Sequence, residues 1–196
     1  MNLQWLTAEK ASQWASWLWI ALLIVWVAMR LGIKRAKQFE TFGEFLQHGI
    51  PATLGFWLLF GKLENWGWLN HRLLPNALGE WAVGLFLTAL GIGMSIWARF
   101  ALGSNWSGAV TLKDNHELIR RGPYRWIRHP IYTGLLAAMI GTALIRGHLR
   151  GYLGFVIVLA TFYFKARREE SFLRKEFGEG FEAHTRDTGM FLPKLT

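Results

Sequence analysis

The chain has 196 residues, of which 52% are hydrophobic and only 18% are charged, and its formal net charge is +9. Soluble domains carry about 25% charged residues. This deficit, with several long uncharged runs, excludes an ordinary soluble domain and indicates an integral membrane protein. The positive charge therefore indicates membrane orientation and not nucleic-acid binding. Cysteine is absent, which excludes disulfides, thiol nucleophiles and cysteine-based metal sites.

Three apolar segments are expected in the first half of the chain. Residues 11–29 are uncharged and long enough to cross a bilayer, and no cleavable signal peptide is expected before them. The second segment has its apolar part at 51–60, where Pro51 suits the first turn of a helix or a kink. The third segment, 81–98, contains small residues that would allow another helix to approach closely. These small residues are Gly84, Gly91 and Ser95.

The second half of the chain is predicted to contain a helical hairpin. After a polar connection at 99–129, Pro130 is expected at the first helical position, where its missing N–H costs nothing. The fourth and fifth apolar segments, 131–145 and 151–164, are joined by a short basic link. Each spans only about 21–23 Å, against about 30 Å of hydrocarbon. They are therefore expected to be tilted, extended by long basic side chains, or partly sheltered by other helices.

The charged tail begins as a continuation of the fifth segment. Leu173 and Phe177 are four residues apart and share one face of an amphipathic helix, for which Gly178 is the expected end. The predicted fold is thus all-α, a polytopic membrane bundle of about five transmembrane helices. Residues 1–98 supply the first three helices, and 99–196 form a second region with the hairpin and the tail.

The distribution of basic residues predicts an orientation. Of the 22 Lys and Arg residues, 17 lie in segments 30–42, 99–129 and 165–196, which share one side of a five-span topology. The excess of positive charge on the cytoplasmic side places these segments in the cytoplasm and the N-terminus outside. The expected location is the cell inner membrane.

The stretch 116–134, HELIRRGPYRWIRHPIYTG, is basic, aromatic and rich in turns. The hairpin joins this stretch to the tail, and a hairpin brings its two ends together. A polar pocket is therefore predicted at the membrane surface. The residues expected to face one another there are Arg128, His129 and Tyr132 on one side and Arg167, Glu169 and Glu170 on the other.

Two ordered motifs resemble the isoprenylcysteine carboxyl methyltransferases. The first is H-x-L-x-x-x-G-P-Y-x-x-x-R-H-P-x-Y-x-G, starting at His116. The second is E-E-x-x-L-x-x-x-F-G, starting at Glu169 and followed by F-L-P at 191–193. The segment LGSNWS at 102–107 fits the bacterial branch of the family. The resemblance covers about residues 97–193, and the wider superfamily includes phospholipid N-methyltransferases and membrane thiol methyltransferases.

The resemblance implies that residues 99–196 are a methyltransferase catalytic region, with S-adenosylmethionine bound in a cytoplasmic pocket without a Rossmann domain. The implied cofactor-lining residues are His116, Glu117, Leu118, Ile119, Tyr124, Arg128, His129, Pro130, Ile131, Tyr132 and Glu170. Their chemistry agrees, because Arg suits the cofactor's carboxylate, a carboxylate or a Tyr face suits its sulfonium, and apolar or aromatic side chains suit its adenine.

The resemblance also implies catalytic roles for Glu170 and for an Arg just before the Glu pair, which would hold the acceptor's carboxylate. Arg167 and Arg168 are both candidates for substrate binding, and Lys165 occupies a nearby helical position. Two positions depart from the usual Tyr of the family, since Phe181 and His184 stand there. The expected partners are a lipophilic small-molecule acceptor and membrane lipid, with no metal.

Other readings stay open at this point. An amine acceptor would have to lose a proton, so phospholipid N-methylation would need Glu170 as a general base. S-methylation of a thiol is a further enzyme reading. A protein that only binds anionic lipid is the non-enzymatic reading, because loop Arg residues such as Arg120, Arg121 and Arg125 are suited to interfacial anchoring. The acceptor and the oligomeric state do not follow from the sequence.

Overall fold

A computed structural model describes residues 7–29, 36–39, 41–61, 66–103, 111–113 and 118–194, with only the backbone of 36–39 and 111–113. Within these residues the chain forms six α-helices, and they are α1 (Ala8–Ala28), α2 (Phe42–Phe60), α3 (Leu78–Leu102), α4 (Pro130–Arg146), α5 (Leu149–Phe177) and α6 (Glu179–Asp187). Two short 3-10 helices are η1 (Gly67–Asn70) and η3 (Gly122–Arg125). Strands β1 (Ala36–Phe39) and β2 (Thr111–Lys113) pair antiparallel, which the sequence did not predict.

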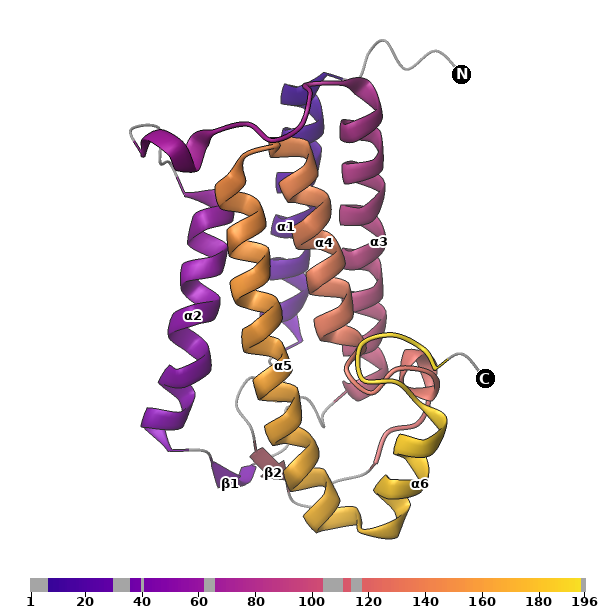
Figure 1. The fold of residues 1–196 in the computed structure, drawn as a ribbon. Coiled ribbons are helices and arrows are strands. Elements are labelled where there is room, and N and C mark those ends of the chain that lie inside the picture. The colour runs from indigo at the N-terminus through magenta and orange to yellow at the C-terminus, as the bar shows by residue number, and fades with distance from the viewer. Residues whose placement is uncertain are drawn as a thin grey trace.

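Helices α1 to α5 run alongside one another as a bundle, and α5 extends past the others at the lower end, where α6 turns back beside it (Figure 1). Among the described residues, three helices, α1, α3 and α5, are long and apolar enough to cross a membrane, and α4 is a shorter apolar helix. The predicted helical membrane protein is therefore confirmed. The total of five spans stays a prediction.

Local signals in the sequence set several helix ends. Thr41 and Glu44 form a reciprocal capping box at the start of α2, which satisfies backbone N–H groups that lack helical partners. Pro51 lies inside α2, well after its start, so of the two predicted places, a first turn or a kink, the first turn is excluded. Pro130 is at the first position of α4, as predicted. Gly178 ends α5 with a φ of 49°, a conformation that glycine adopts without a steric penalty.

Small residues bring α3 and α4 almost into backbone contact, as the sequence predicted. A Cβ at Gly91 would overlap the carbonyl oxygen of Gly134, and one at Gly84 would lie 2.6 Å from the carbonyl oxygen of Gly141. The hydroxyl of Ser95 donates to the carbonyl of Ile131 over 3.3 Å. Tight approach maximises dispersion contacts between helices, which is how helices associate in lipid.

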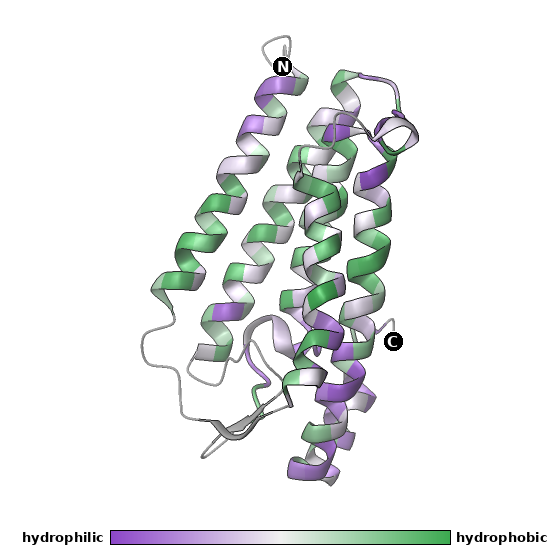
Figure 2. Ribbon diagram, turned by 90° about the vertical axis from the view of Figure 1, so that its left-hand side faces the viewer, coloured by the Kyte–Doolittle hydropathy of each residue, from purple (hydrophilic) through white to green (hydrophobic). Residues whose placement is uncertain are grey.

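The short helix α4 occupies the centre of the bundle. Its residues Leu136, Ala138 and Met139 belong to the main core together with Trp19 of α1 and Phe162 of α5. Of the three expectations for a short apolar segment, shelter by other helices is therefore the one found for α4. Green apolar residues cover much of the helices between their ends, and α5 turns purple where it leaves the bundle (Figure 2). Many large apolar side chains on these helices are exposed, which suits contact with lipid tails.

Candidate functional site

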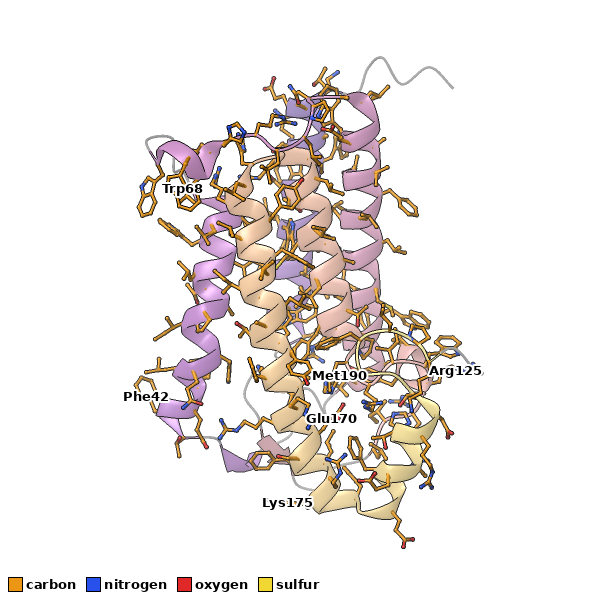
Figure 3. All side chains as sticks on the ribbon, viewed as in Figure 1. Phe42, Trp68, Arg125, Glu170, Lys175 and Met190 are labelled. Atoms are coloured by element: carbon orange, nitrogen blue, oxygen red, sulfur yellow. The ribbon has the colours of Figure 1, made fainter. Side chains whose placement is uncertain are left out.

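The α4–α5 hairpin brings the loop before α4 against the charged end of α5, as its topology predicted. Gly147 turns the chain between the two helices with a φ of 69°. Glu170 on α5 lies beside the tail segment that carries Met190 (Figure 3). Four segments therefore meet at this end of the bundle: the loop before α4, the first turn of α4, the end of α5 and the tail.

Glu170 is the centre of a buried ionic network. Its Oε1 accepts a hydrogen bond from Nε of Arg128 over 2.7 Å and lies 3.2 Å from Nε2 of His129. Glu170 is only 4% exposed. Arg128 also donates to the carbonyl oxygen of Thr188 in the tail. A buried carboxylate is stable when paired and hydrogen-bonded, and Glu170 meets both conditions.

Glu169 holds the other side of the same imidazole ring. One of its oxygens accepts a 2.6 Å hydrogen bond from the hydroxyl of Tyr132, and the other lies 3.4 Å from Nδ1 of His129. His129 is therefore placed between two carboxylates, one at each ring nitrogen. Both nitrogens can donate at once only when the ring is protonated, so this geometry favours the imidazolium.

The electrostatics of the network follow from this geometry. Burial alone would lower the pKa of His129, but its contacts with Glu169 and Glu170 outweigh burial and raise that pKa. Burial would likewise raise the pKa of Glu170, yet His129 and Arg128 lower it to about 2. The pKa of Glu169 is also lowered, against the effect of burial, chiefly by its hydrogen bond with His129. At neutral pH both carboxylates are therefore ionised.

Aromatic rings stack beside this network. The ring of Tyr132 lies nearly parallel to that of His129, with centroids 5.6 Å apart, and it also stacks on Phe162 at 4.5 Å. Nζ of Lys165 lies 5.9 Å from the centroid of the Tyr132 ring. A cation near an aromatic face is attracted by the ring's quadrupole. The site thus combines a carboxylate pair with an electron-rich aromatic surface.

An apolar wall completes this end of the site. Tyr124 and Ile131 are buried with Ala98 of α3, and Ile119 and Tyr132 pack against them. Leu118 is half-buried. Pro130 is buried at the start of α4. His116 and Glu117, which the family resemblance also assigns to the cofactor, lie outside the described residues.

The tail forms a short parallel ladder with the loop before α4, which the sequence did not predict. The backbone N–H groups of Arg128 and His129 donate to the carbonyls of Gly189 and Met190 over 2.9 and 3.0 Å. The hydroxyl of Thr133 donates to the carbonyl of Phe191 over 2.7 Å. The F-L-P sequence at 191–193 was the available signal, but its partners are distant in the chain. The tail therefore fixes the backbone that carries Arg128 and His129.

Helix α6 packs against the charged end of α5, next to the site (Figure 1). Phe181 and His184, the two departures from the family pattern, are buried on α6. Burial, followed by the nearby charges of Arg120 and Arg128, lowers the pKa of His184. Arg120 donates to the carbonyl of Gly180, so it supports α6 in addition to any lipid contact. The two residues thus have packing roles in this structure.

The two candidate arginines on α5 have different surroundings. Arg168 pairs with Glu44 of α2, and successive helical residues are about 100° apart, so its side chain leaves α5 nearly opposite to Glu170. Arg167 is exposed and makes no hydrogen bond or ion pair with the part of the chain that the structure describes. Of the predicted facing set on α5, Glu169 and Glu170 contact the loop before α4, and Arg167 does not.

Comparison of the chain with known proteins finds methyltransferases. A family model described as phospholipid methyltransferase matches residues 80–180. A probable protein-S-isoprenylcysteine O-methyltransferase of Oryza sativa subsp. indica is 31% identical over 141 residues, which are 68% of this chain and 72% of that protein. Protein-S-isoprenylcysteine O-methyltransferase of Mus musculus is 30% identical over 157 residues, 76% of this chain and 53% of that protein.

The chain is also similar to a solved structure. That structure is the eukaryotic intramembrane Ras methyltransferase ICMT (isoprenylcysteine carboxyl methyltransferase), with a TM-score of 0.49 and 26% sequence identity. The match covers 79% of this chain and 53% of that one. The chain thus spans about half the length of the mouse protein and of the solved protein.

Proposed function

The chain belongs to the phospholipid methyltransferase family and is a membrane methyltransferase, and from this premise we propose that it methylates the carboxylate of a lipophilic, isoprenylcysteine-like acceptor with S-adenosylmethionine as methyl donor. The resemblance to isoprenylcysteine carboxyl methyltransferases predicted from the motifs is confirmed. The matched residues 80–180 contain nearly all of α3 and the whole of α4 and α5, including the end of α5 that carries both glutamates.

The residues of the site fit the proposed methyl donor. The donor has a carboxylate, a sulfonium cation and an adenine ring, and the site has a guanidinium, two ionised carboxylates and an aromatic and apolar wall. The carboxylates of Glu169 and Glu170 and the ring of Tyr132 suit a cation. The cluster of Ile119, Tyr124 and Ile131 suits a flat apolar ring. When bound, S-adenosylmethionine supplies a methyl group on a positively charged sulfur.

The network around Glu170 holds the side chains of the site in place and does not transfer protons. Glu170 has a pKa of about 2, so it is a weak base near neutral pH. His129 has a raised pKa and holds its proton between the two carboxylates. An acceptor carboxylate is already ionised at pH 7 and needs no base. The weakness of Glu170 as a base supports carboxyl O-methylation over N-methylation of an amine.

The acceptor is proposed to bind through Arg167. Its guanidinium is exposed and not engaged by the described residues, whereas Arg168 is held by Glu44. A guanidinium binds a carboxylate with two parallel hydrogen bonds, which fixes the orientation of the oxygens. The lipophilic part of the acceptor would lie against the apolar surface of the bundle and enter from the bilayer. Correct placement and exclusion of water then provide most of the rate enhancement.

The proposed topology has five spans, with the N-terminus outside and the site in the cytoplasm. Two features support it. Strands β1 and β2, the loop before α4 and the tail are described parts of the basic segments, and they lie at the end of the bundle that carries the site. The charged end of α5 leaves the bundle on that same side (Figures 1 and 2). The donor would therefore reach the site from the aqueous side, and the acceptor from the membrane.

The buried network of Arg128, Glu170 and His129 carries this proposal. Isothermal titration of the purified protein with S-adenosylmethionine and with S-adenosylhomocysteine tests donor binding directly. We expect saturable binding of both. A transfer assay with donor labelled in its methyl group, against host lipid extract and a synthetic farnesylcysteine analogue, then tests the acceptor. Absence of donor binding by folded protein would sink the proposal, and a labelled product without a methyl ester would refute its acceptor class.

A further inference from the structure

The bundle end opposite to the proposed active site carries a second cluster of polar side chains. It forms where the segment before α3 crosses the α4–α5 turn, at the top of Figure 1. There the N–H of Leu73 donates to the carbonyl of Gly147, and the N–H of Leu149 donates to that of His71. The cluster, called the arginine cluster below, consists of Arg72, Glu80, Arg146, His148, Arg150 and Tyr152.

The arginine cluster contains most of the unsatisfied buried polar atoms in the described part of the chain. Seven buried side-chain N or O atoms there have no hydrogen-bond partner, and all but Nε of Arg99 belong to this cluster. The cluster atoms are Nη2 of Arg72, Oε2 of Glu80, Nε of Arg146, Nδ1 of His148, Nε of Arg150 and the hydroxyl of Tyr152. Buried polar groups are normally paired, so such a concentration calls for a partner.

The backbone holds two of the guanidinium groups in place. Arg72 donates to the carbonyls of Leu74 and Arg146 over 3.0 and 2.7 Å. Arg150 donates from Nη1 to the carbonyls of Leu58 and Gly61 over 2.9 and 2.8 Å. Each group thus has a fixed position and at least one further N–H without an acceptor. Fixed donors lose little conformational entropy when a ligand binds.

Arg146 is the least engaged of the three arginines. Its guanidinium makes no hydrogen bond or ion pair within the described residues and lies 5.2 Å from the ring centroid of Phe60. The stem of this side chain can therefore pack while its charged end stays available. Replacing Arg146 removes a charge from the cluster without breaking a described polar contact.

The charges of the cluster do not balance. Three arginines face one carboxylate, Glu80, whose Oε2 is 3.8 Å from Nη2 of Arg72 and so beyond hydrogen-bond distance. Arg146 and Arg150 are close enough to repel each other. An anion placed among them would relieve this repulsion and accept the unpaired N–H groups. The side chains of Arg72 and Glu80 are 29% and 17% exposed, which opens the cluster to the surface on their side.

The position of the arginine cluster in the fold indicates which kind of anion it binds. Trp66 and Trp68 are exposed in the segment between α2 and α3, and Trp68 projects outward at this end of the bundle (Figure 3). Exposed Trp residues gather at membrane–water interfaces, where the phosphate groups of lipids lie. Guanidinium groups match the geometry of phosphate oxygens. We propose that the arginine cluster binds a phosphate-bearing anion, either a phospholipid headgroup or free phosphate, at a site distinct from the methyltransferase centre.

Thermal unfolding of the full-length protein in dodecyl maltoside, a detergent without phosphate, tests this site. The three additions are dioctanoyl phosphatidylglycerol, inorganic phosphate, and dioctanoylglycerol, which lacks a phosphate, all at matched ionic strength. A saturable rise in Tm with the phospholipid alone identifies a headgroup site. A saturable rise with inorganic phosphate as well identifies a site for phosphate itself. Equal effects of phospholipid and dioctanoylglycerol, or no saturable rise, would overturn the proposal.

Two variants test whether the ligand binds at the arginine cluster. Arg146→Met keeps an apolar stem over Phe60 and removes the charge, and we expect it to weaken binding of the effective ligand about tenfold. Lys10→Met removes one positive charge from the N-terminal part of α1 at the same end of the bundle and should bind as the unmodified protein does. An unchanged affinity in Arg146→Met would place the ligand elsewhere. The proposal does not rest on the methyltransferase activity.

Discussion

Nε of Arg128 and Oε1 of Glu170 are 2.7 Å apart, although 42 residues separate them in the chain. Arg128 lies in the loop before α4, and Glu170 lies beyond the apolar part of α5. The hairpin between them brings these two residues together. His129 contacts Glu170, and the carbonyl of Thr188 accepts a hydrogen bond from Arg128. The contact therefore joins the proposed donor-binding loop, the charged end of α5 and the tail into one unit.

Glu170→Gln removes the charge at the centre of this unit and nearly preserves its shape. We expect loss of methyl transfer, weaker donor binding and destabilisation by about 2 to 3 kcal/mol, because hydrogen bonds to a charged group are replaced by weaker ones. Titration calorimetry and thermal unfolding measure these effects. Glu176→Gln is the matched control on the exposed part of the same helix and should behave as the unmodified protein. Full transfer by Glu170→Gln would remove Glu170 from the site.

The pH dependence of stability should show the charges of the network. The pKa of His129 is raised above 6.5 in the folded protein. Its contribution to the free energy of unfolding is therefore complete below pH 6.5 and is lost as the pH rises through the pKa of the folded state. The pKa of Glu170 is lowered from 4.5 to about 2, so its contribution is complete above pH 4.5 and is lost between there and pH 2. Tm should therefore fall on both sides of the interval from pH 4.5 to 6.5.

His129→Asn tests the alkaline side. This variant should flatten the fall in Tm above pH 6.5, and it should also reduce the fall on the acid side, because the contacts with His129 help to lower the pKa of Glu169 and of Glu170. Thermal unfolding over the pH range provides the measurement. An alkaline slope that is the same in both proteins would show that His129 does not titrate as its contacts require.

The contact between α3 and α4 predicts a contrast between two glycines of one helix. Gly91→Ala places a methyl group against the carbonyl of Gly134, and we expect destabilisation by about 1–3 kcal/mol from overpacking. Gly93→Ala faces open space and should be neutral or slightly stabilising, because Ala favours the helix. Thermal unfolding in one detergent compares them. Equal stability of the two variants would contradict the close helix approach.

The turn of the tail should control access to the backbone of the site. A Cβ at Gly189 would overlap the carbonyl oxygen of Leu192, so Gly189→Ala should release the tail from the loop before α4. The amide hydrogens of Arg128 and His129 would then exchange faster with solvent. Hydrogen exchange with mass spectrometry measures this. Gly180→Ala meets only the end of a flexible Arg side chain and serves as the control, in which protection should be retained.

Acceptor binding should distinguish the two arginines of α5. Arg167→Lys removes the proposed two-point contact with a carboxylate, so KM for the acceptor should rise about tenfold or more while donor affinity stays unchanged. Arg168→Lys keeps a cation near Glu44 and should change KM little. Steady-state transfer kinetics with a farnesylcysteine analogue measure both. A larger effect at Arg168 than at Arg167 would reverse the assignment.

Several features of the fold and of the site were predictable, because they depend on the local sequence pattern and on the direction of the chain. The apolar segments placed α1, α3, α4 and α5, the motif positions placed Pro130 and Gly178, and the hairpin brought His129 towards Glu170. Helix α6 was not predicted, since a nine-residue helix after Gly178 has too weak a pattern to separate from a polar tail. The pairing of Arg168 with Glu44 was not predictable either, because these residues are 124 positions apart.

The sequence alone determined that this protein is a helical membrane methyltransferase, because hydrophobic length and ordered motifs are properties of the linear chain. Only the tertiary structure decided that His129 lies between Glu169 and Glu170 and that the tail fixes the backbone of the loop before α4. It also decided that six buried polar atoms without a hydrogen-bond partner in the described part of the chain gather at the opposite end. These features depend on side chains from distant segments converging within a few ångströms. The hairpin predicted that the loop before α4 and the end of α5 meet, but residue spacing along the chain does not give the distances between particular atoms.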